Sequence, residues 1–399
     1  MTDQFRVFRE RPFRLLWIGQ TTSMLGDALV PVALAFAVLD LTHSASDLGI
    51  VLAAQVIPNV ALVLAGGVIA DRLPRQEVML GSDVVRGAAQ VALAVLLLGG
   101  AARLWHLVAF AAVYGAAEAF FQPASTGLVP MTVPPEGLQQ ANALLGLSRS
   151  ASVIVGPALA GVLVGLYSPG VVFAADAGTF VVSVASLAQL RLPSLPATKS
   201  HSFLTDLATG WREVRKRTWL WVMIAWASTF MFFVAAPMQV LGPLITKQSL
   251  GGAPAWGTIA AAGGIGSVVG GIIALRWHPV RPILAASSGV FLTALPQALL
   301  AMRAPVAWIA GGRLLAGVSL AFFGAVWITT LQRHVPPEAI SRVSAYDWMG
   351  SQVFLPLGLL VVGPVEESIG ASATMWISTA WAVVSTTLVL SVRSVREVS

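Results

Sequence analysis

Three carboxylates lie inside stretches that are otherwise apolar, and a buried carboxylate can take up and release a proton. Asp27 shares a helical face with Gln20 and Ser23, while Glu118 and Asp176 occupy two further apolar stretches. A charge near the centre of a bilayer costs roughly 2.5–3.5 kcal/mol on insertion scales, so each group needs a reason to be there. We predict Asp27 as the leading proton-coupling residue, followed by Glu118 and Asp176. A structural hydrogen bond or ion pair is the alternative for each.

Four charged residues are predicted to form one network, because their charges sum to zero and their depths are similar. They are Asp83, Arg86, Glu118 and Arg149. A network of paired charges of this kind indicates a structural or gating role, not proton transfer. If Arg149 pairs with Glu118, Glu118 stays ionised, which is why it ranks below Asp27 as a proton carrier.

Polar and aromatic side chains at mid-span depth are candidates for lining a substrate cavity. Tyr114, Glu118 and Gln122 recur at a spacing of four and share one face. The predicted lining residues are Gln20, Ser23, Tyr114, Gln122, Trp226, Trp327 and Trp348.

The elements that position these residues are predicted to be membrane-spanning helices. The chain has 399 residues, of which 56% are hydrophobic and only 11% charged, whereas a soluble domain carries about 25% charged residues. A span needs roughly 20 mostly apolar residues. We predict twelve spans: 13–39, 48–70, 78–100, 104–122, 139–166, 171–190, 219–245, 255–275, 282–301, 306–330, 342–363 and 371–392.

The distribution of Lys and Arg predicts the orientation of these spans. With the N-terminus inside, 18 of the 24 basic residues fall in inner segments and three in outer loops. The positive-inside rule therefore predicts a multi-pass cell-membrane protein with both termini cytoplasmic. The same asymmetry explains the basic pI without a nucleic-acid partner. The chain has no cysteine and its five His lack a metal-ligand spacing, so we predict no metal site.

An internal repeat predicts two related halves. Ala119-Phe-Phe returns as Ala321-Phe-Phe and Val133-Pro-Pro-Glu as Val335-Pro-Pro-Glu, both at an offset of 202 residues. We expect an all-α membrane protein of two pseudo-symmetric six-helix bundles, with the substrate path between them. The predicted bundles are residues 1–190 and 219–399. A cytoplasmic linker with an amphipathic helix, residues 191–218, connects them.

The connection between the second and third spans carries a distinctive motif, Gly67-Val-Ile-Ala-Asp71-Arg72-Leu-Pro-Arg75. Gly67 is expected to let another helix approach closely. The motif resembles the Gly-x-x-x-Asp-Arg-x-x-Arg loop of the major facilitator superfamily, although Pro74 replaces the usual glycine before the last Arg. The resemblance implies a conformational latch formed by Gly67, Asp71, Arg72 and Arg75. A plain positive-inside turn is the alternative.

The fifth span carries a second motif, in which Ser152, Gly156, Pro157 and Gly161 follow one another at short spacing. Pro157 removes a backbone hydrogen bond and can bend the helix. The motif is similar to the Gly-Pro-x-x-Gly motif of the superfamily's antiporters, with Ser152 in place of the first glycine. The resemblance implies export, and ordinary close packing is the alternative.

The resulting interpretation is a monomeric secondary transporter that exchanges protons for a small amphipathic organic compound. Within the superfamily, the residues from Gln20 to Asp27 and the run Gln122-Pro123-Ala124 resemble bacterial drug, macrolide and siderophore exporters. Neither an enzyme activity nor a cofactor is expected, since the proton gradient would supply the energy. The alternatives are an importer on the same fold, or a membrane sensor or assembly protein without transport.

Overall fold

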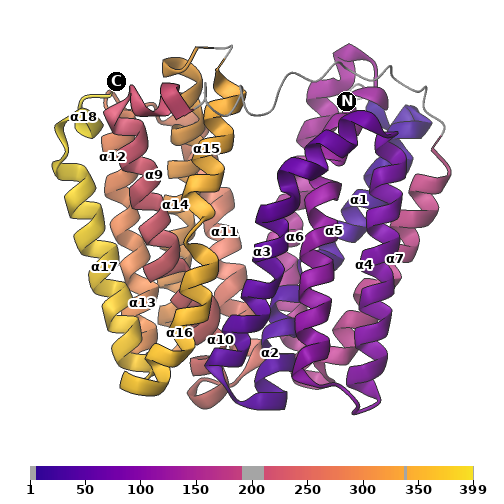
Figure 1. Ribbon diagram of the computed structural model, residues 1–399, viewed down its shortest axis with the longest axis horizontal. Coiled ribbons are helices and arrows are strands. Elements are labelled where there is room, and N and C mark those ends of the chain that lie inside the picture. Colours follow the sequence, from indigo (N-terminus) through magenta and orange to yellow (C-terminus); the bar gives the residue numbers. More distant parts are fainter. Residues whose placement is uncertain (1–5, 191–210, 337–338, 399) are drawn as a thin grey trace. The chain divides into compact units, whose positions relative to one another are not determined.

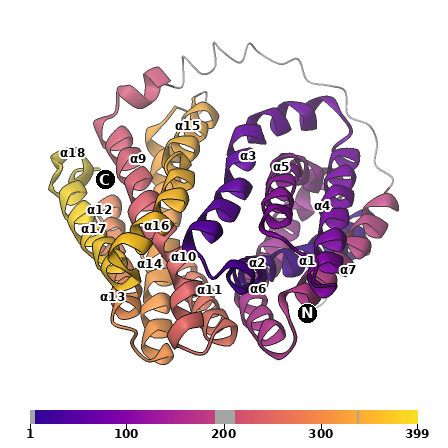
Figure 2. The same cartoon turned by 60° about the horizontal axis from the view of Figure 1, so that its bottom comes forward.

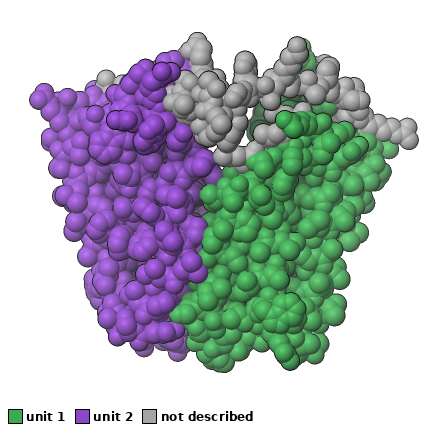
Figure 3. All heavy atoms as spheres, viewed as in Figure 1, with its two compact units in different colours: residues 1–198 green, residues 199–399 purple. Residues whose placement is uncertain are grey.

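The computed structural model describes residues 6–190, 211–336 and 339–398, and the side chains of Asp71 and Arg342 are among a few that it leaves out. The described residues contain 12 helices or helix pairs long and apolar enough to cross a membrane. This confirms the all-α prediction and the predicted number of spans. The chain divides into two compact units, residues 1–198 and 199–399 (Figure 3). Most of the predicted linker, residues 191–210, lies outside the described residues.

The N-terminal unit consists of helices that run along its length with short connections (Figure 1). Its long helices are α1 (Arg11–Asp27), α2 (Val30–Thr42), α3 (Ala45–Arg72), α4 (Arg75–Leu98), α5 (Leu104–Leu128), α6 (Leu138–Leu166) and α7 (Pro169–Ala188). Three short 3₁₀ turns, η1 (Arg6–Arg9), η2 (Val129–Met131) and η3 (Pro135–Gly137), flank them. In this unit α4 packs against α5 and α7, and α1 packs against α6 and α7.

The first span is interrupted in the middle, because α1 ends at Asp27 and α2 begins at Val30. Pro31 sits in the first turn of α2, where its missing N–H leaves a backbone carbonyl of the preceding turn without its helical partner. The Ala28 N–H donates to the Met24 carbonyl and the Leu29 N–H to the Gly26 carbonyl, both in the last turn of α1. Asp27 therefore lies at a break between two helices, where its side chain is not confined to a regular helical surface.

The C-terminal unit repeats this arrangement. It comprises α9 (Thr218–Phe230), the π-turn η4 (Met231–Ala235), α10 (Ala236–Ser249), α11 (Ala253–Arg276), α12 (Pro282–Gly289), η5 (Val290–Thr293), α13 (Ala294–Ala301), α14 (Val306–His334), α15 (Ile340–Gln352), α16 (Leu355–Ile369), α17 (Ala371–Ser391) and α18 (Arg393–Arg396). Trp219, Trp226 and Phe230 belong to a buried hydrophobic core, in which α9 contacts α14 through Trp219 and Trp327 and also packs against α17.

Glycines allow the second and fourth spans of each unit to approach backbone to backbone. In the N-terminal unit, a Cβ at Gly115 would lie 2.0 Å from the Gln55 carbonyl oxygen of α3. In the C-terminal unit, a Cβ at Gly317 would lie 2.2 Å from the Gly263 carbonyl oxygen of α11. Helices α3 and α5 run side by side, as do α11 and α14 (Figures 1 and 2). The glycines of α11 and α14 therefore let these two helices pack closely.

One glycine prediction was wrong. A Cβ at Gly67 would meet nothing within 4 Å, whereas one at Gly66 would lie 2.3 Å from the Ala119 carbonyl oxygen of α5. The close approach thus falls one residue earlier, because successive helical residues point about 100° apart and only Gly66 faces α5.

Candidate functional site

A largely buried network of ionisable side chains joins three helices of the N-terminal unit. Arg86 of α4 bonds to Asp83 one turn earlier and lies 3.3 Å from Oδ2 of Asp27 at the end of α1. The Tyr114 hydroxyl of α5 donates a hydrogen bond to Oδ1 of the same Asp27. One guanidinium is therefore shared by two carboxylates, and Asp27 is held from two sides.

The surroundings of Arg86 keep its charge away from water. Its residue is 1% exposed, and its guanidinium carbon lies 4.3 Å from the ring centre of Phe121 and 4.8 Å from that of Phe180. Aromatic faces attract a cation, and they exclude water from it. The two carboxylates are consequently the principal counter-charges of Arg86 within the described residues.

Asp176 belongs to an adjoining buried cluster. It accepts hydrogen bonds from the Gln90 side chain of α4 and, at 2.9 Å, from the Thr179 hydroxyl. Gly26 permits this arrangement, since a Cβ there would lie 2.0 Å from Oδ1 of Asp176. Asp176 is fully buried and is not among the residues that line the cavity next to Asp27. This environment supports the structural alternative for Asp176 over proton coupling.

A polar cavity of about 160 Å³ opens next to Asp27. The lining residues are Gln20, Ser23, Met24, Asp27, Ala28, Arg86, Glu118, Phe121, Gln122, Ser125, Arg149, Ser152 and Val153. The Asp27 side chain is 32% exposed, whereas those of Arg86 and Asp83 are 2% and 0% exposed. Asp27 is thus the acid that both contacts the buried Arg86 and faces the cavity.

The predicted partners within the network are rearranged. Glu118 and Arg149 line the same cavity, but the described residues show no ion pair between them. Arg86 instead pairs with Asp27, a contact that the sequence analysis did not anticipate. Tyr114 is buried against Asp27 and does not line the cavity, whereas Gln20, Ser23 and Gln122 do.

The motif of the fifth span packs against the break in the first. A Cβ at Gly156 of α6 would lie 2.4 Å from the Ala28 Cβ and 2.9 Å from its carbonyl oxygen. Ser148 and Ser152 are buried on the same side of α6, and Ser148 accepts a hydrogen bond of 2.9 Å from Thr21 of α1. Pro157 lies within α6, and Gly161 is buried near it. The stripe of small residues therefore touches the chain next to Asp27.

The motif between the second and third spans is anchored through its last residues. Arg75 donates a hydrogen bond of 2.6 Å to the Gly127 carbonyl of α5, and Gln76 bonds to the carbonyls of Leu187 and Leu190. Arg72 is exposed. The Asp71 side chain lies outside the described residues, so its part in a latch remains a prediction.

The C-terminal unit contains a pocket of different chemistry. Its volume is about 210 Å³, and its lining residues are Met223, Ala227, Met231, Phe323, Trp327, Asp347, Trp348, Ser351 and Gln352. The indole N–H of Trp327 donates a hydrogen bond of 2.8 Å to Oδ2 of Asp347. Of the predicted cavity tryptophans, Trp327 and Trp348 line this pocket. Trp226 lies behind it in the core, against Phe230 and Phe323.

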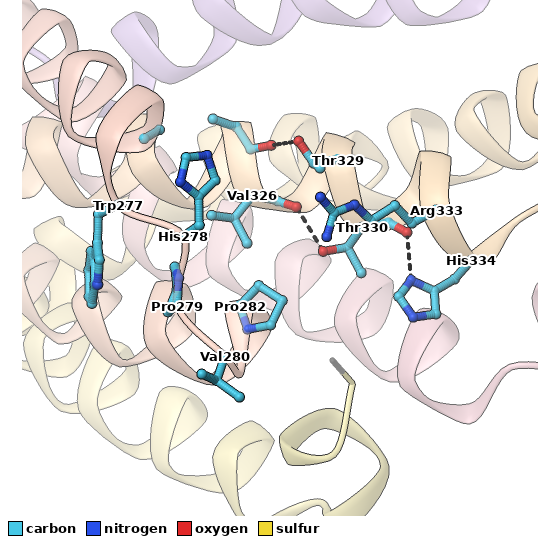
Figure 4. Close-up of a pocket in the computed structure, with 12 residues that line it drawn as sticks. Trp277, His278, Pro279, Val280, Pro282, Val326, Thr329, Thr330, Arg333 and His334 are labelled. Carbon is cyan, nitrogen blue, oxygen red and sulfur yellow. Dashed lines mark hydrogen bonds between the residues drawn. The ribbon is translucent and has the colours of Figure 1, made fainter.

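A third pocket, of about 410 Å³, lies where α11 ends and the following loop meets the last turns of α14 (Figure 4). Trp277, His278 and Val280 come from the loop side, and Arg333 and His334 from α14. The His334 ring is tied to the Thr330 carbonyl at 3.0 Å. This pocket sits at the ends of the helices and contacts none of the predicted proton-coupling residues.

Comparisons with known proteins identify a family match and several similar proteins. The sequence profile described as Major Facilitator Superfamily matches residues 16–359. The chain is similar to macrolide efflux protein A of Streptococcus pyogenes, with 24% identity over 95% of this chain and 94% of that protein. It is also similar to the enterobactin exporter EntS of Salmonella paratyphi A, with 27% identity over 86% of this chain and 82% of the exporter.

Solved structures show the same fold. The nucleoside transporter NupG superposes with a TM-score of 0.76 at 13% identity, covering 95% of this chain and 98% of NupG. A bacterial homologue of the iron transporter ferroportin in an inward-facing state gives a TM-score of 0.73 at 17% identity, with 96% and 98% covered. At these identities the likeness concerns the fold alone.

Proposed function

The chain belongs to the major facilitator superfamily, whose members are secondary transporters and not enzymes, and we propose that it exports a small amphipathic organic compound in exchange for protons. The observation that carries this proposal is the position of Asp27. It lies at a helix break, faces a polar cavity and contacts a buried arginine that it shares with a second carboxylate.

Protonation of Asp27 changes the charge of the network. With both carboxylates ionised, Asp27, Asp83 and Arg86 together carry one net negative charge, and one proton neutralises it. Protonated Asp27 no longer attracts Arg86 as an anion, so Arg86 is left with Asp83 as its ionised partner. The ends of α1 and α2 are then free to shift against α6, where Gly156 keeps the contact free of side-chain obstruction. Proton binding can thereby bias two states of alternating access.

The direction of transport is inferred from two supports. The similar proteins named for a transport direction are an efflux protein and an exporter. The stripe around Gly156 resembles the antiporter motif, and it packs against the break that holds Asp27. We further propose a monomer in the cell membrane, with both termini cytoplasmic and bundles over residues 1–190 and 219–399, because basic residues gather in the inner segments.

The experiment uses purified protein in proteoliposomes and the variant Asp27→Asn. Without its ionisable carboxyl, the variant should lose uptake driven by a pH gradient but keep counterflow, which exchanges substrate for substrate without proton movement. Asp47→Asn, an acid-to-amide change in the first turn of α3, serves as the matched control and should retain both activities. Full gradient-driven uptake by Asp27→Asn would contradict the proposal.

The substrate for this assay comes from a screen in cells. Accumulation of a panel of dyes and antibiotics should fall when the wild-type chain is expressed, because export lowers the internal concentration. Increased accumulation of a compound would indicate import and overturn the proposed direction.

A further inference from the structure

The pocket beside Asp347 in the C-terminal unit combines a single carboxylate with aromatic and thioether side chains. Asp347 is the one ionisable side chain among its described lining residues. Trp327, Trp348 and Phe323 supply rings, while Met223 and Met231 supply sulfur atoms. A negative charge in such a wall is costly unless a positive group accompanies it.

The Asp347 carboxylate has one hydrogen-bond donor and no counter-ion among the described residues. Oδ2 accepts the Trp327 indole N–H at 2.8 Å, and within the described residues no cationic side chain pairs with this carboxylate. Asp83 and Asp27, in contrast, both contact Arg86. The remaining acceptor capacity of Asp347 is thus available to a ligand that carries positive charge.

A second acceptor lies in the same wall. Oε1 of Gln352 is buried and has no hydrogen-bond partner within the described part of the chain, although Gln352 lines the pocket. A buried acceptor without a donor is unfavourable, because it has lost its hydrogen bonds to water. The indole N–H of Trp327 already donates to Asp347. A ligand that carries N–H donors would therefore satisfy the remaining acceptors of the pocket.

The rings are arranged to receive a cation as well. Phe323 and Trp327 stack at an interplanar angle of 11°, and Trp348 is 40% exposed at the pocket. Aromatic faces within about 6 Å attract ammonium groups, and methionine adapts to irregular apolar shapes.

We propose that this pocket binds the protonated amine of an amphipathic organic cation, with Asp347 as its counter-ion and Gln352 as an additional acceptor. The inference rests on the proposed export function and narrows its substrate class. The volume of about 210 Å³ is below the roughly 300–1,000 Å³ of sites for whole drug-sized ligands, so the pocket holds the charged end of the molecule.

The test measures binding at equilibrium, without any gradient. Full-length protein in nanodiscs of phosphatidylcholine is titrated with dansylcadaverine, a primary amine that is protonated at neutral pH, and with its uncharged N-acetyl derivative. Wild-type protein should prefer the amine at least about tenfold, which is about 1.4 kcal/mol. Asp347→Asn keeps the shape of the side chain and should reduce this preference to less than about threefold.

The matched control is Glu366→Gln in α16, an acid-to-amide change in the same unit outside the pocket lining. It should keep the wild-type preference. An unchanged preference in Asp347→Asn, or no preference in wild-type protein, would overturn the proposal.

Two further variants cover the case in which Asp347→Asn does not fold. Gln352→Leu removes the second acceptor and Trp348→Ala removes an exposed ring; each should lower the preference, and an unchanged preference in both would overturn the proposal. Binding is measured without a gradient and gradient-driven uptake is measured separately, so a failure of proton coupling is distinguishable from a failure of this site.

Discussion

The pocket beside Asp27 and the pocket beside Asp347, called here the N-terminal and C-terminal pockets, are lined by equivalent spans of the two halves of the chain. Their chemistry differs. The N-terminal pocket is lined from α1, α5 and α6 and by Arg86 of α4, and the C-terminal pocket from α9, η4, α14 and α15. The first, fourth and fifth spans of each half thus line its pocket, and the third span adds Arg86 in the N-terminal unit. Adding the repeat offset of 202 converts Phe121 to Phe323, Ser125 to Trp327 and Arg149 to Ser351, and all six residues line their pockets.

The comparison separates the residues that build the scaffold from those that give a pocket its chemistry. The same offset relates Gly115 to Gly317 and Gly156 to Gly358, and each of the four packs against a neighbouring backbone. The pocket walls diverged instead. Among the described lining residues, the N-terminal pocket has four ionisable side chains, Asp27, Arg86, Glu118 and Arg149, and the C-terminal pocket has Asp347. A duplicated framework has thus acquired a charged pocket and an aromatic one.

The largest expected effect concerns the charged pocket. Arg86→Met should destabilise the protein by about 3–5 kcal/mol, because it leaves Asp83 fully buried without its counter-ion. Thermal unfolding in detergent, followed by loss of the monodisperse peak in size-exclusion chromatography, measures the effect. The double variant Arg86→Met with Asp83→Asn should recover part of the loss, since the uncompensated charge is gone.

The matched change in the other unit is Arg313→Met. Arg313 of α14 is also an arginine within a span, but its Nε has no hydrogen-bond partner among the described residues and no acid pairs with it. Replacing it by an apolar side chain of similar length should therefore cost less than about 1 kcal/mol or stabilise the protein. Equal losses in both variants would refute the distinction between a paired and an unpaired arginine.

An intermediate effect tests the shared scaffold. Gly156→Ala should destabilise by about 1–3 kcal/mol, because the new Cβ would lie 2.4 Å from the Ala28 Cβ. Gly358→Ala should behave alike, since its Cβ would lie 2.8 Å from the Ala236 Cβ. Gly146→Ala, in the same helix as Gly156 but with nothing within 4 Å, is the control and should unfold like wild type. A tolerated Gly156→Ala would contradict the equivalence of the two contacts.

Much of this fold is readable from sequence, because hydrocarbon imposes long apolar runs on any helix that crosses it. The runs located twelve spans, and the offset between Ala119 and Ala321 indicated related halves. Gly67 was misassigned because one residue of rotation decides which glycine faces the neighbour, and a motif does not fix that rotation.

The sequence predicted which residues belong to the candidate site, but not which of them contact one another. Asp27 and Arg86 were singled out separately, because a charge inside an apolar run is visible by itself. Their contact depends on how α1 and α4 are rotated and on the break after Asp27, neither of which the spacing specifies. Asp347 was not among the predicted site residues, because its bond to Trp327 joins residues 20 positions apart on different helices.

The smallest expected effect contrasts the buried network around Arg86 with a partly exposed one around Glu213. Glu213 accepts bonds from Lys216 at 2.6 Å and Arg217 at 2.9 Å, and Arg217 also bonds to the His334 carbonyl of α14. The hydrogen bonds from Lys216 and Arg217 lower the pKa of Glu213 to about 2. The unfolded value is about 4.3, so the stabilisation is complete above that pH and disappears as the pH falls through about 2. Glu213→Gln should therefore lower the melting temperature by a small, constant amount from neutral pH down to about 5, and the difference should shrink below about 4. If Glu213→Gln lowered the melting temperature as much as Arg86→Met, or if salt did not reduce its effect, the difference in solvent exposure between the two networks would not explain their stabilities.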